Sequence, residues 1–409
     1  MGRLGISIYP DRMGIEETKE YIKLASKYGF QRIFTSFLQI KGDQDQVVAR
    51  FKDLIEYGKS LGMDTMVDMN PKLFKQLGVS YDNLKFFHDI GAWAVRLDEG
   101  FTGMEEARMT HNPYGLKVEV NMSRGTHYID QIMDYAPDRQ NLIGSHNFYP
   151  QRYTGLGLDY FKQTSQQYRR HNINTAAFVN APSGSVGPWP LQEGMVSLEM
   201  HRGQSLFTQI MHLKMLGLID DILISNAGVS EADLKEAAAA FNASQPTVRV
   251  IADAGLTDTE RKIIFDSQHT YRGDHSDYVL RSTMTRVWYN DEDVPARHTV
   301  PIHKGDVLVM NNEYAQYKAE TQIALQDLEN NGRVNVVGHV APTDMMLLET
   351  LQPWSDFWLT GESWVPEPVS TRQQKSATMI FNPARKVKLM LCTTSKMVIQ
   401  AKKWISYRS

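Results

Sequence analysis

The chain has 409 residues, of which 42% are hydrophobic and 22% are charged, so its composition excludes a disordered protein. The first 360 residues carry 35 basic and 45 acidic side chains, a net charge of −10 that argues against non-specific nucleic-acid binding. The single cysteine, Cys392, excludes an internal disulfide, and the lack of a signal-peptide core or of a run of about 20 apolar residues predicts a cytoplasmic protein without a membrane segment.

Short apolar runs alternate with helix-like segments from the first residues onward. Eight of these runs are predicted strands: Leu4–Tyr9, Arg32–Leu38, Asp64–Met69, Ala92–Asp98, Lys117–Met122, Asn141–Asn147, Thr175–Asn180 and Asp221–Ser225. The spacing of apolar residues predicts helices over Ile15–Tyr28 and Val47–Leu61, which stop at Gly29 and Gly62. Eight strand–helix units in about 240 residues match the size of a (β/α)8 barrel. We therefore predict an α/β fold with a TIM barrel over residues 1–243.

The alternation stops after Phe241, and residues 246–358 are predicted to form a smaller, β-rich domain. Its predicted strands are Val248–Ala252, Tyr278–Arg281, Thr283–Tyr289, Asp306–Met310 and Val334–Val340. Leu256–Phe265 and Ala319–Leu328 are predicted helices. Residues 361–409 form a third region, with nine basic and two acidic side chains, to which we assign no function.

Polar side chains stand at the ends of most predicted barrel strands. Because the carboxyl ends of barrel strands converge on one face, these side chains are expected to share a pocket. Desolvating several acids, amides and an imidazole there is costly unless they bind a ligand or each other. The candidates are Tyr9, Asp68, Asn70, Arg96, Asp98, Glu119, Asn121, His146, Asn147, Tyr149 and Asn180. A buried structural role for His146 and a purely positioning role for Arg96 remain open.

Asp98 and Glu119 end neighbouring strands, so their carboxyl groups are expected about 5 Å apart. This separation suits two carboxylates that act at one glycosidic carbon, as acid and nucleophile or as acid and orienter of a substrate group. Crowding also raises the pKa of one carboxyl, which supplies the protonated partner. The sequence has no P-loop, no G-x-S-x-G elbow and no H-E-x-x-H helix, and we predict neither a metal nor an organic cofactor.

Two loops add candidate substrate contacts. The segment Asn180–Gly194, rich in glycine and proline, is expected to be a lid or substrate wall whose Trp189 stacks on a sugar, with an exposed linker as the alternative. Ser225–Gly228 opens the last barrel helix, where barrels often bind phosphate, although Ser and Asn are equally common as helix caps.

The motifs RLDEGF (Arg96–Phe101), EVNMS (Glu119–Ser123), HNFYPQRYTGLGL (His146–Leu158) and LEMHR (Leu198–Arg202) resemble those of the bacterial 6-phospho-N-acetylmuramidase family. The resemblance covers roughly residues 3–358 and implies a (β/α)8 domain followed by a cyclophilin-like domain. It also implies hydrolysis of N-acetylmuramic acid 6-phosphate-β-1,4-N-acetylglucosamine, a disaccharide phosphorylated during uptake and recovered from the cell wall. By resemblance, Asp98 and Glu119 are the catalytic acids, and the sugar site is shaped by His146, Asn147, Tyr149 and Arg152.

Several alternatives stay open at this point. The adjacent pair Asp98–Glu99 allows a route in which the substrate acetamido oxygen attacks the anomeric carbon. Arg281 is a candidate for binding the phosphate or the lactyl carboxylate, and equally a surface or interdomain arginine. The barrel also suits a phosphosugar epimerase or aldolase, or a non-enzymatic carbohydrate-binding protein, because this fold supports many functions.

Overall fold

The computed structural model describes residues 2–37, 44–69, 77–189 and 193–361. Its first part is a closed barrel of eight parallel strands, in which β1 pairs with both β2 and β8. The barrel strands are β1 Leu4–Ser7, β2 Arg32–Ser36, β3 Asp64–Met69, β4 Ala94–Leu97, β5 Lys117–Asn121, β6 Leu142–Ser145, β7 Asn174–Val179 and β8 Asp221–Ile224. Each overlaps one of the eight predicted strands, so the predicted TIM barrel is confirmed.

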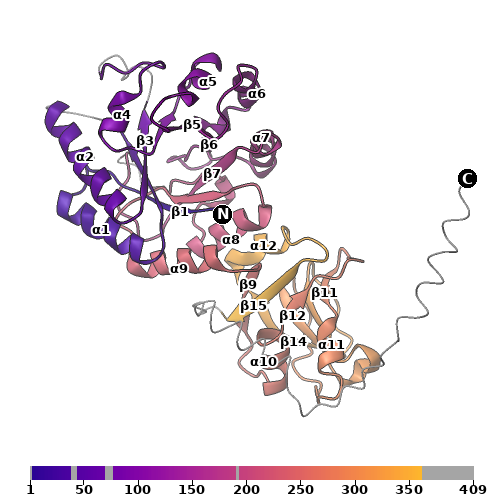
Figure 1. Ribbon diagram of the computed structural model, residues 1–409. Coiled ribbons are helices and arrows are strands. Elements are labelled where there is room, and N and C mark those ends of the chain that lie inside the picture. The colour runs from indigo at the N-terminus through magenta and orange to yellow at the C-terminus, as the bar shows by residue number, and fades with distance from the viewer. Residues whose placement is uncertain (1, 38–43, 70–76, 190–192, 362–409) are drawn as a thin grey trace, which may run out of the picture. The chain divides into compact units, whose positions relative to one another are not determined.

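Helices follow the barrel strands and pack outside them (Figure 1). They are α1 Ile15–Lys27, α2 Gln44–Ser60, α4 Lys85–Asp89, α5 Met104–Thr110, α6 Tyr128–Met133, α7 Leu158–Arg170, α8 Leu206–Leu216 and α9 Glu231–Asn242, with short 3-10 helices η1 Met122–Arg124 and η2 Glu199–His201. Gly29 and Gly62 follow α1 and α2 with φ angles of +81° and +77°, a conformation that favours glycine and ends a helix. Both predicted helix stops are therefore confirmed.

Charged side chains, and not only aliphatic ones, fill the barrel interior. At the amino ends of the strands, Arg3 pairs with Asp64 at 2.9 Å and with Asp221 at 3.2 Å. Arg32 pairs with Asp221 at 2.9 Å and with Glu119, further along the barrel, at 2.6 Å. The guanidinium groups of Arg3 and Arg32 both lie over the Trp93 ring. A continuous series of ion pairs thus begins at the amino ends of the strands and runs toward the carboxyl ends.

The second part is a seven-stranded mixed sheet with the order β10-β15-β9-β14-β12-β13-β11. Its strands are β9 Thr247–Ala252, β10 His269–Thr270, β11 Val279–Ser282, β12 Asp306–Met310, β13 Thr321–Ala324, β14 Val334–Val340 and β15 Asp356–Gly361. Its helices are α10 Asp258–Phe265, α11 Met284–Trp288, α12 Met345–Leu348, η3 Asn312–Tyr317 and η4 Pro342–Asp344. The Arg272 N–H donates to the Arg281 carbonyl at 3.0 Å, so the two edge strands approach each other and nearly close a barrel. This arrangement is consistent with the predicted cyclophilin-like domain.

Two predicted elements of this domain are wrong. Thr283–Tyr289 was expected as a strand, but α11 lies there, and its Val287 and Trp288 are exposed, so the β-branched and aromatic pattern does not mark a buried strand. Ala319–Leu328 was expected as a helix, yet β13 forms there because its backbone pairs with β11 and β12 on both sides. Tertiary pairing overrides the helix propensity of this segment.

Candidate active site

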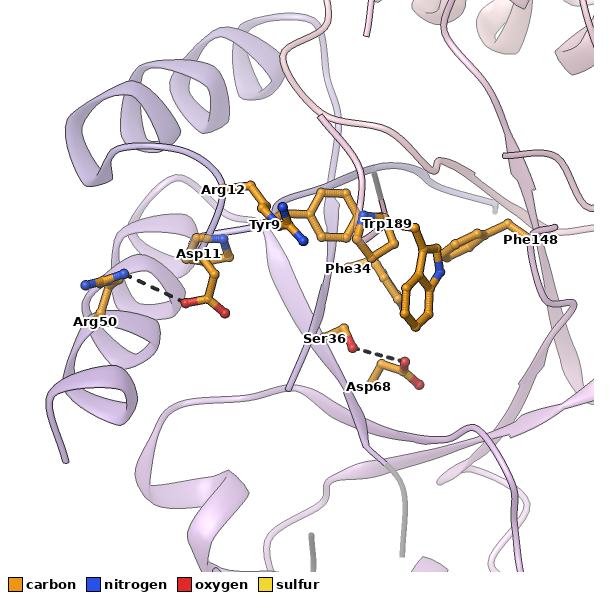
Figure 2. Close-up of a pocket in the computed structure, with 11 residues that line it drawn as sticks. Tyr9, Asp11, Arg12, Phe34, Ser36, Arg50, Asp68, Phe148 and Trp189 are labelled. Carbon is orange, nitrogen blue, oxygen red and sulfur yellow. Dashed lines mark hydrogen bonds and ion pairs between the residues drawn. The ribbon is translucent and has the colours of Figure 1, made fainter. Parts of the chain in front are cut away.

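A cavity of about 460 Å³ opens at the carboxyl ends of barrel strands. Figure 2 shows side chains from β2, β3 and the loops after β1, β6 and β7 around it. The lining residues are Tyr9, Pro10, Asp11, Arg12, Phe34, Ser36, Arg50, Asp68, Phe148, Pro188 and Trp189. Four aromatic rings and several charged groups thus surround a space large enough for a sugar. Tyr9 and Asp68, predicted as site residues, and Trp189, predicted as a stacking ring, line it.

Arg96 connects the polar residues at the base of this region. Its Nη1 donates to Asp68 Oδ1 at 2.8 Å and to Asp98 Oδ1 at 3.4 Å, its Nε donates to Ser145 Oγ at 3.0 Å, and its Nη2 donates to Asn147 Oδ1. Arg96 is buried, so these bonds fix the guanidinium plane and, with it, the two carboxylates. The Asp68 and Asp98 oxygens share one nitrogen and therefore lie at most about 6 Å apart, close to the spacing of paired glycosidase carboxylates.

The two carboxyl groups on Arg96 have different surroundings. Asp68 is buried, and desolvation raises its pKa to about 6, with Asp98 adding to the increase and the Arg96 charge opposing it. The Asp98 side chain is 37% exposed and faces solvent at the rim. A buried carboxyl with a raised pKa beside an open carboxylate is the asymmetry expected of an acid and its partner.

Glu119 lies deeper in the barrel than its sequence position suggested. Its side chain is fully buried, its Oε2 accepts from Arg32 at 2.6 Å, and its Oε1 lies 3.7 Å from Arg96 Nε. Glu119 is not among the residues that line the cavity, and two arginines enclose its carboxylate. In the structure, Glu119 instead supports Arg96 from below, because it stands opposite Arg96 in the β4–β5 register.

Three further predicted residues hold the rim in place. Asn121 Nδ2 donates to the Asp98 carbonyl at 3.3 Å and so fixes the loop that carries Asp98. The Asn147 backbone N–H donates to Ser123 Oγ at 3.0 Å. His146 is buried, bonded through its two nitrogens to Ser123 and Ser165, and stacked on Phe161. Burial lowers its pKa to about 3, so we find a neutral structural histidine behind the site wall.

The remaining predicted residues are spread more widely. Tyr149 is half-buried, and desolvation raises the pKa of its phenol, which lies near Ser123 and is influenced by the Asp98 and Arg96 charges. Arg152 is exposed and 3.9 Å from Glu193. Asn180 Oδ1 accepts from the Met195 N–H at 3.0 Å and closes the loop after β7. Asn70 lies outside the described residues.

At both phosphate-binding positions suggested by the sequence, the side chains already bond to other parts of the protein. Asn226 uses its amide on the backbone of Ala181 and Gly184, and Ser225 Oγ donates to the Val179 and Met195 carbonyls. Arg281 lies on β11 in the second domain, where its guanidinium donates to both oxygens of Glu320 at 2.8 and 3.1 Å. Within the described part of the chain, no three His, Cys, Asp or Glu side chains are grouped to hold a metal.

Sequence reasoning missed Arg12, Arg32 and Arg50. Arg50 projects into the cavity from α2, and its spacing of three and four residues from Val47 and Leu54 was the available signal, because it places a cation beside the buried face of the helix. Arg32 begins β2 directly before buried Ile33 and Phe34, so a charge on an inward face was visible in the sequence. No helix of the described residues has the length and apolar character needed to cross a membrane.

Comparison with known proteins identifies the family. Residues 4–239 match the N-terminal domain, and residues 246–360 the C-terminal domain, of 6-phospho-N-acetylmuramidase. The chain belongs to the 6-phospho-N-acetylmuramidase family. It is therefore a glycosidase, as predicted, and the epimerase, aldolase and non-enzymatic alternatives are set aside.

Two solved structures are similar over most of the chain. The crystal structure of an uncharacterized B. cereus protein is 38% identical, covers 88% of this chain and 100% of that chain, and has a TM-score of 0.82. The crystal structure of a conserved Enterococcus faecalis protein of unknown function is 24% identical, covers 92% of this chain and 99% of that chain, and has a TM-score of 0.68, a likeness that shows the shared fold. No curated protein matches the sequence.

Proposed function

We propose that this glycosidase hydrolyses the β-1,4 bond between N-acetylmuramic acid 6-phosphate and N-acetylglucosamine in bacterial cell-wall recycling, in the cytoplasm. The observation that carries the proposal is the pair Asp68 and Asp98, both bonded to Arg96 next to an aromatic-lined cavity in a chain of this family. The cavity favours a single sugar ring, because Phe34, Phe148 and Trp189 offer apolar surfaces to it.

Asp68 is the proposed general acid. Its carboxyl, with a pKa of about 6, donates a proton to the glycosidic oxygen as the bond to the anomeric carbon breaks. The carboxylate of Asp98, which is open to solvent, stabilises positive charge at that carbon, directly or by orienting the acetamido group of the substrate. Water then adds to the anomeric carbon, its proton returns to the carboxylate of Asp68, and the two free sugars leave.

Glu119, the second acid expected from the sequence, is proposed to act through Arg96. The negative charge at its Oε1 holds the Arg96 guanidinium in position between Asp68 and Asp98. Arg32 pairs with its other oxygen, Oε2. Under this assignment Glu119 is a positioning residue. Asn147 and Tyr149 are proposed to contact the sugar from the loop after β6, which begins beside Arg96.

The test combines two substrates with four variants. We expect the purified protein to release N-acetylglucosamine from the phosphorylated disaccharide, and Asp68→Asn and Asp98→Asn to lower kcat/KM by about 100-fold or more. On an aryl glycoside such as the 4-nitrophenyl derivative of N-acetylmuramic acid 6-phosphate, whose leaving group needs no proton, Asp68→Asn should recover most of its activity. Asp98→Asn and Glu119→Gln should lose activity on both substrates.

The control is Asp82→Asn, because Asp82 is exposed and its ion-pair partner among the described residues is Arg108, which does not line the cavity. It should leave kcat/KM unchanged, and all variants should keep the circular dichroism spectrum of the parent. The function is wrong if the parent protein does not cleave the disaccharide. If Glu119→Gln rather than Asp68→Asn recovers on the aryl glycoside, Glu119 is the acid and our assignment is wrong.

A further inference from the structure

The cavity carries opposite charge at its two ends. Among the described residues, Asp68 and the neighbouring Asp98 pair with one cation, Arg96, so these three groups carry a net negative charge when both acids are ionised. At the other end, the described lining residues are two cations, Arg12 and Arg50, and one acid, Asp11, so these three groups carry a net positive charge. Figure 2 shows Asp11, Arg12 and Arg50 on one side of the aromatic rings, away from Asp68 and Ser36.

The two arginines retain hydrogen-bonding capacity for a ligand. Within the part of the chain that the structure describes, no hydrogen bond or ion pair engages the Arg12 guanidinium, although its backbone N–H is held by the Tyr9 carbonyl at 2.8 Å. Arg50 Nε is buried without a hydrogen-bond partner, and its Nη1 is 3.8 Å from Asp11 Oδ1, a loose ion pair. A buried donor without an acceptor is costly, so the Arg50 side chain, which lines the cavity, would gain a bond by turning its guanidinium toward an anion there.

We infer that Arg12 and Arg50 bind the phosphate group of a 6-phosphosugar, which holds the anomeric carbon at the Asp68 and Asp98 end. This inference rests on the proposed function and adds the residues that select the phosphorylated substrate. Guanidinium groups match phosphate oxygens with paired donors, and a dianion gains most where positive charge is in excess. The reverse orientation would bring the phosphate next to Asp98 and, whenever it is ionised, Asp68, and like charges repel across a cavity of this size.

The intervening rings fit this orientation. Phe148 and Trp189 line the cavity together with Phe34, and they offer apolar faces to the pyranose ring. The C6 substituent and the anomeric carbon of a pyranose lie on either side of the ring oxygen, so one bound sugar can reach both ends at once. In this orientation the aromatic rings contact the pyranose, the two arginines contact the phosphate, and the two acids face the anomeric carbon.

Binding of reaction products tests the inference without requiring turnover. By titration calorimetry, Arg12→Gln should weaken the binding of N-acetylmuramic acid 6-phosphate at least 10-fold and leave the binding of N-acetylmuramic acid within about 2-fold. Arg50→Gln should act in the same direction, with a smaller effect, because Asp11 already shares its charge. Arg170→Gln, an exposed change on α7 outside the cavity, is the matched control and should bind both sugars like the parent.

A third ligand separates the two anionic groups of the substrate. N-acetylglucosamine 6-phosphate has no lactyl group, and its binding should depend on Arg12 as that of the muramic acid phosphate does. If Arg12→Gln weakens both muramic acids equally and spares this ligand, the arginine binds the lactyl carboxylate and the inference is overturned. If the phosphosugars depend on Arg12 but the disaccharide is not cleaved, the inference stands and the proposed function fails.

Discussion

Asp68 is subject to opposing influences that set its protonation. Burial and the nearby Asp98 charge favour the neutral carboxyl, while Arg96 and the hydrogen bond from Ser36 favour the carboxylate. The outcome is a pKa of about 6. As the proposed acid, Asp68 is active when protonated, so kcat/KM on the disaccharide should fall as the pH rises through about 6.

A change at Ser36 should shift the pH at which kcat/KM falls on the alkaline side. Ser36→Ala removes a donor that stabilises the ionised form of Asp68, so the pKa should rise and the alkaline limb should shift to higher pH by a few tenths of a unit. The measurement is kcat/KM against pH for the parent and the variant, with Ser26→Ala on α1 as control. A limb that stays fixed, or moves to lower pH, would show that another group controls it.

At the scale of elements, the loops after β6 and β7 are held by one ion pair. Glu199 on η2 accepts from the backbone N–H groups of Tyr153 and Gly155, each at 2.8 Å, and from Arg202 at 2.7 Å. Arg202 in turn donates to the carbonyl of Tyr149 at 3.0 Å and to that of Gly194 at 2.6 Å. These two side chains therefore set the position of the loop that carries Tyr149.

The Glu199–Arg202 ion pair predicts that the stability of the protein depends on pH. The bonds from Arg202 and the two N–H groups lower the pKa of Glu199 to about 2. Its stabilisation is complete above the unfolded pKa of about 4.3 and is lost as the pH falls toward 2. Glu199→Gln should lower the free energy of unfolding by about 1–2 kcal/mol at pH 7 and reduce its slope between pH 4.5 and 2 in urea titrations. An unchanged slope would contradict this role.

The sequence predicted which helices and strands form better than it predicted how deeply a side chain lies within the barrel. All eight barrel strands were found because each is a short, largely apolar run. In contrast, α11 was mistaken for a strand because of its β-branched and aromatic residues, and β13 was missed because its conformation depends on pairing with β11 and β12. For the site, the sequence predicted that Glu119 ends a strand and shares a pocket, and the structure buries its side chain within the barrel. How far it lies below the rim depends on the stagger of the strands, which local sequence does not encode. His146 could not be separated from a site residue for the same reason.

At the scale of the whole molecule, Arg249 on β9 links the mixed sheet to the barrel. Its Nη2 donates to Asp344 Oδ1 at 2.6 Å, and Thr208 on α8 donates to the same oxygen at 2.6 Å. Asp344 is fully buried, so its charge depends on these partners. Arg249→Met should lower the free energy of unfolding by about 3 kcal/mol, because it leaves a buried carboxylate without its cation.

Urea unfolding followed by tryptophan fluorescence measures this effect. Arg249→Lys, which keeps the charge, should lose less stability than Arg249→Met, and Asp344→Asn in the Arg249→Met background should restore part of the loss. If the effects of the two substitutions are simply additive, the pair is not coupled and the contact does not matter to stability.

The ion pairs that connect Arg3, Asp221, Arg32, Glu119 and Arg96 have a consequence for how this enzyme tolerates sequence change. Arg3 stands at the opposite end of the barrel from the cavity. Neutralising Arg3 would leave Asp221 with Arg32 as its only partner in this series, which would weaken the pairing of Arg32 with Glu119 and strengthen that of Glu119 with Arg96. Variation at the amino ends of the strands should therefore alter the pKa of Asp68, the proposed acid, and a kinetic defect need not map to residues that line the cavity.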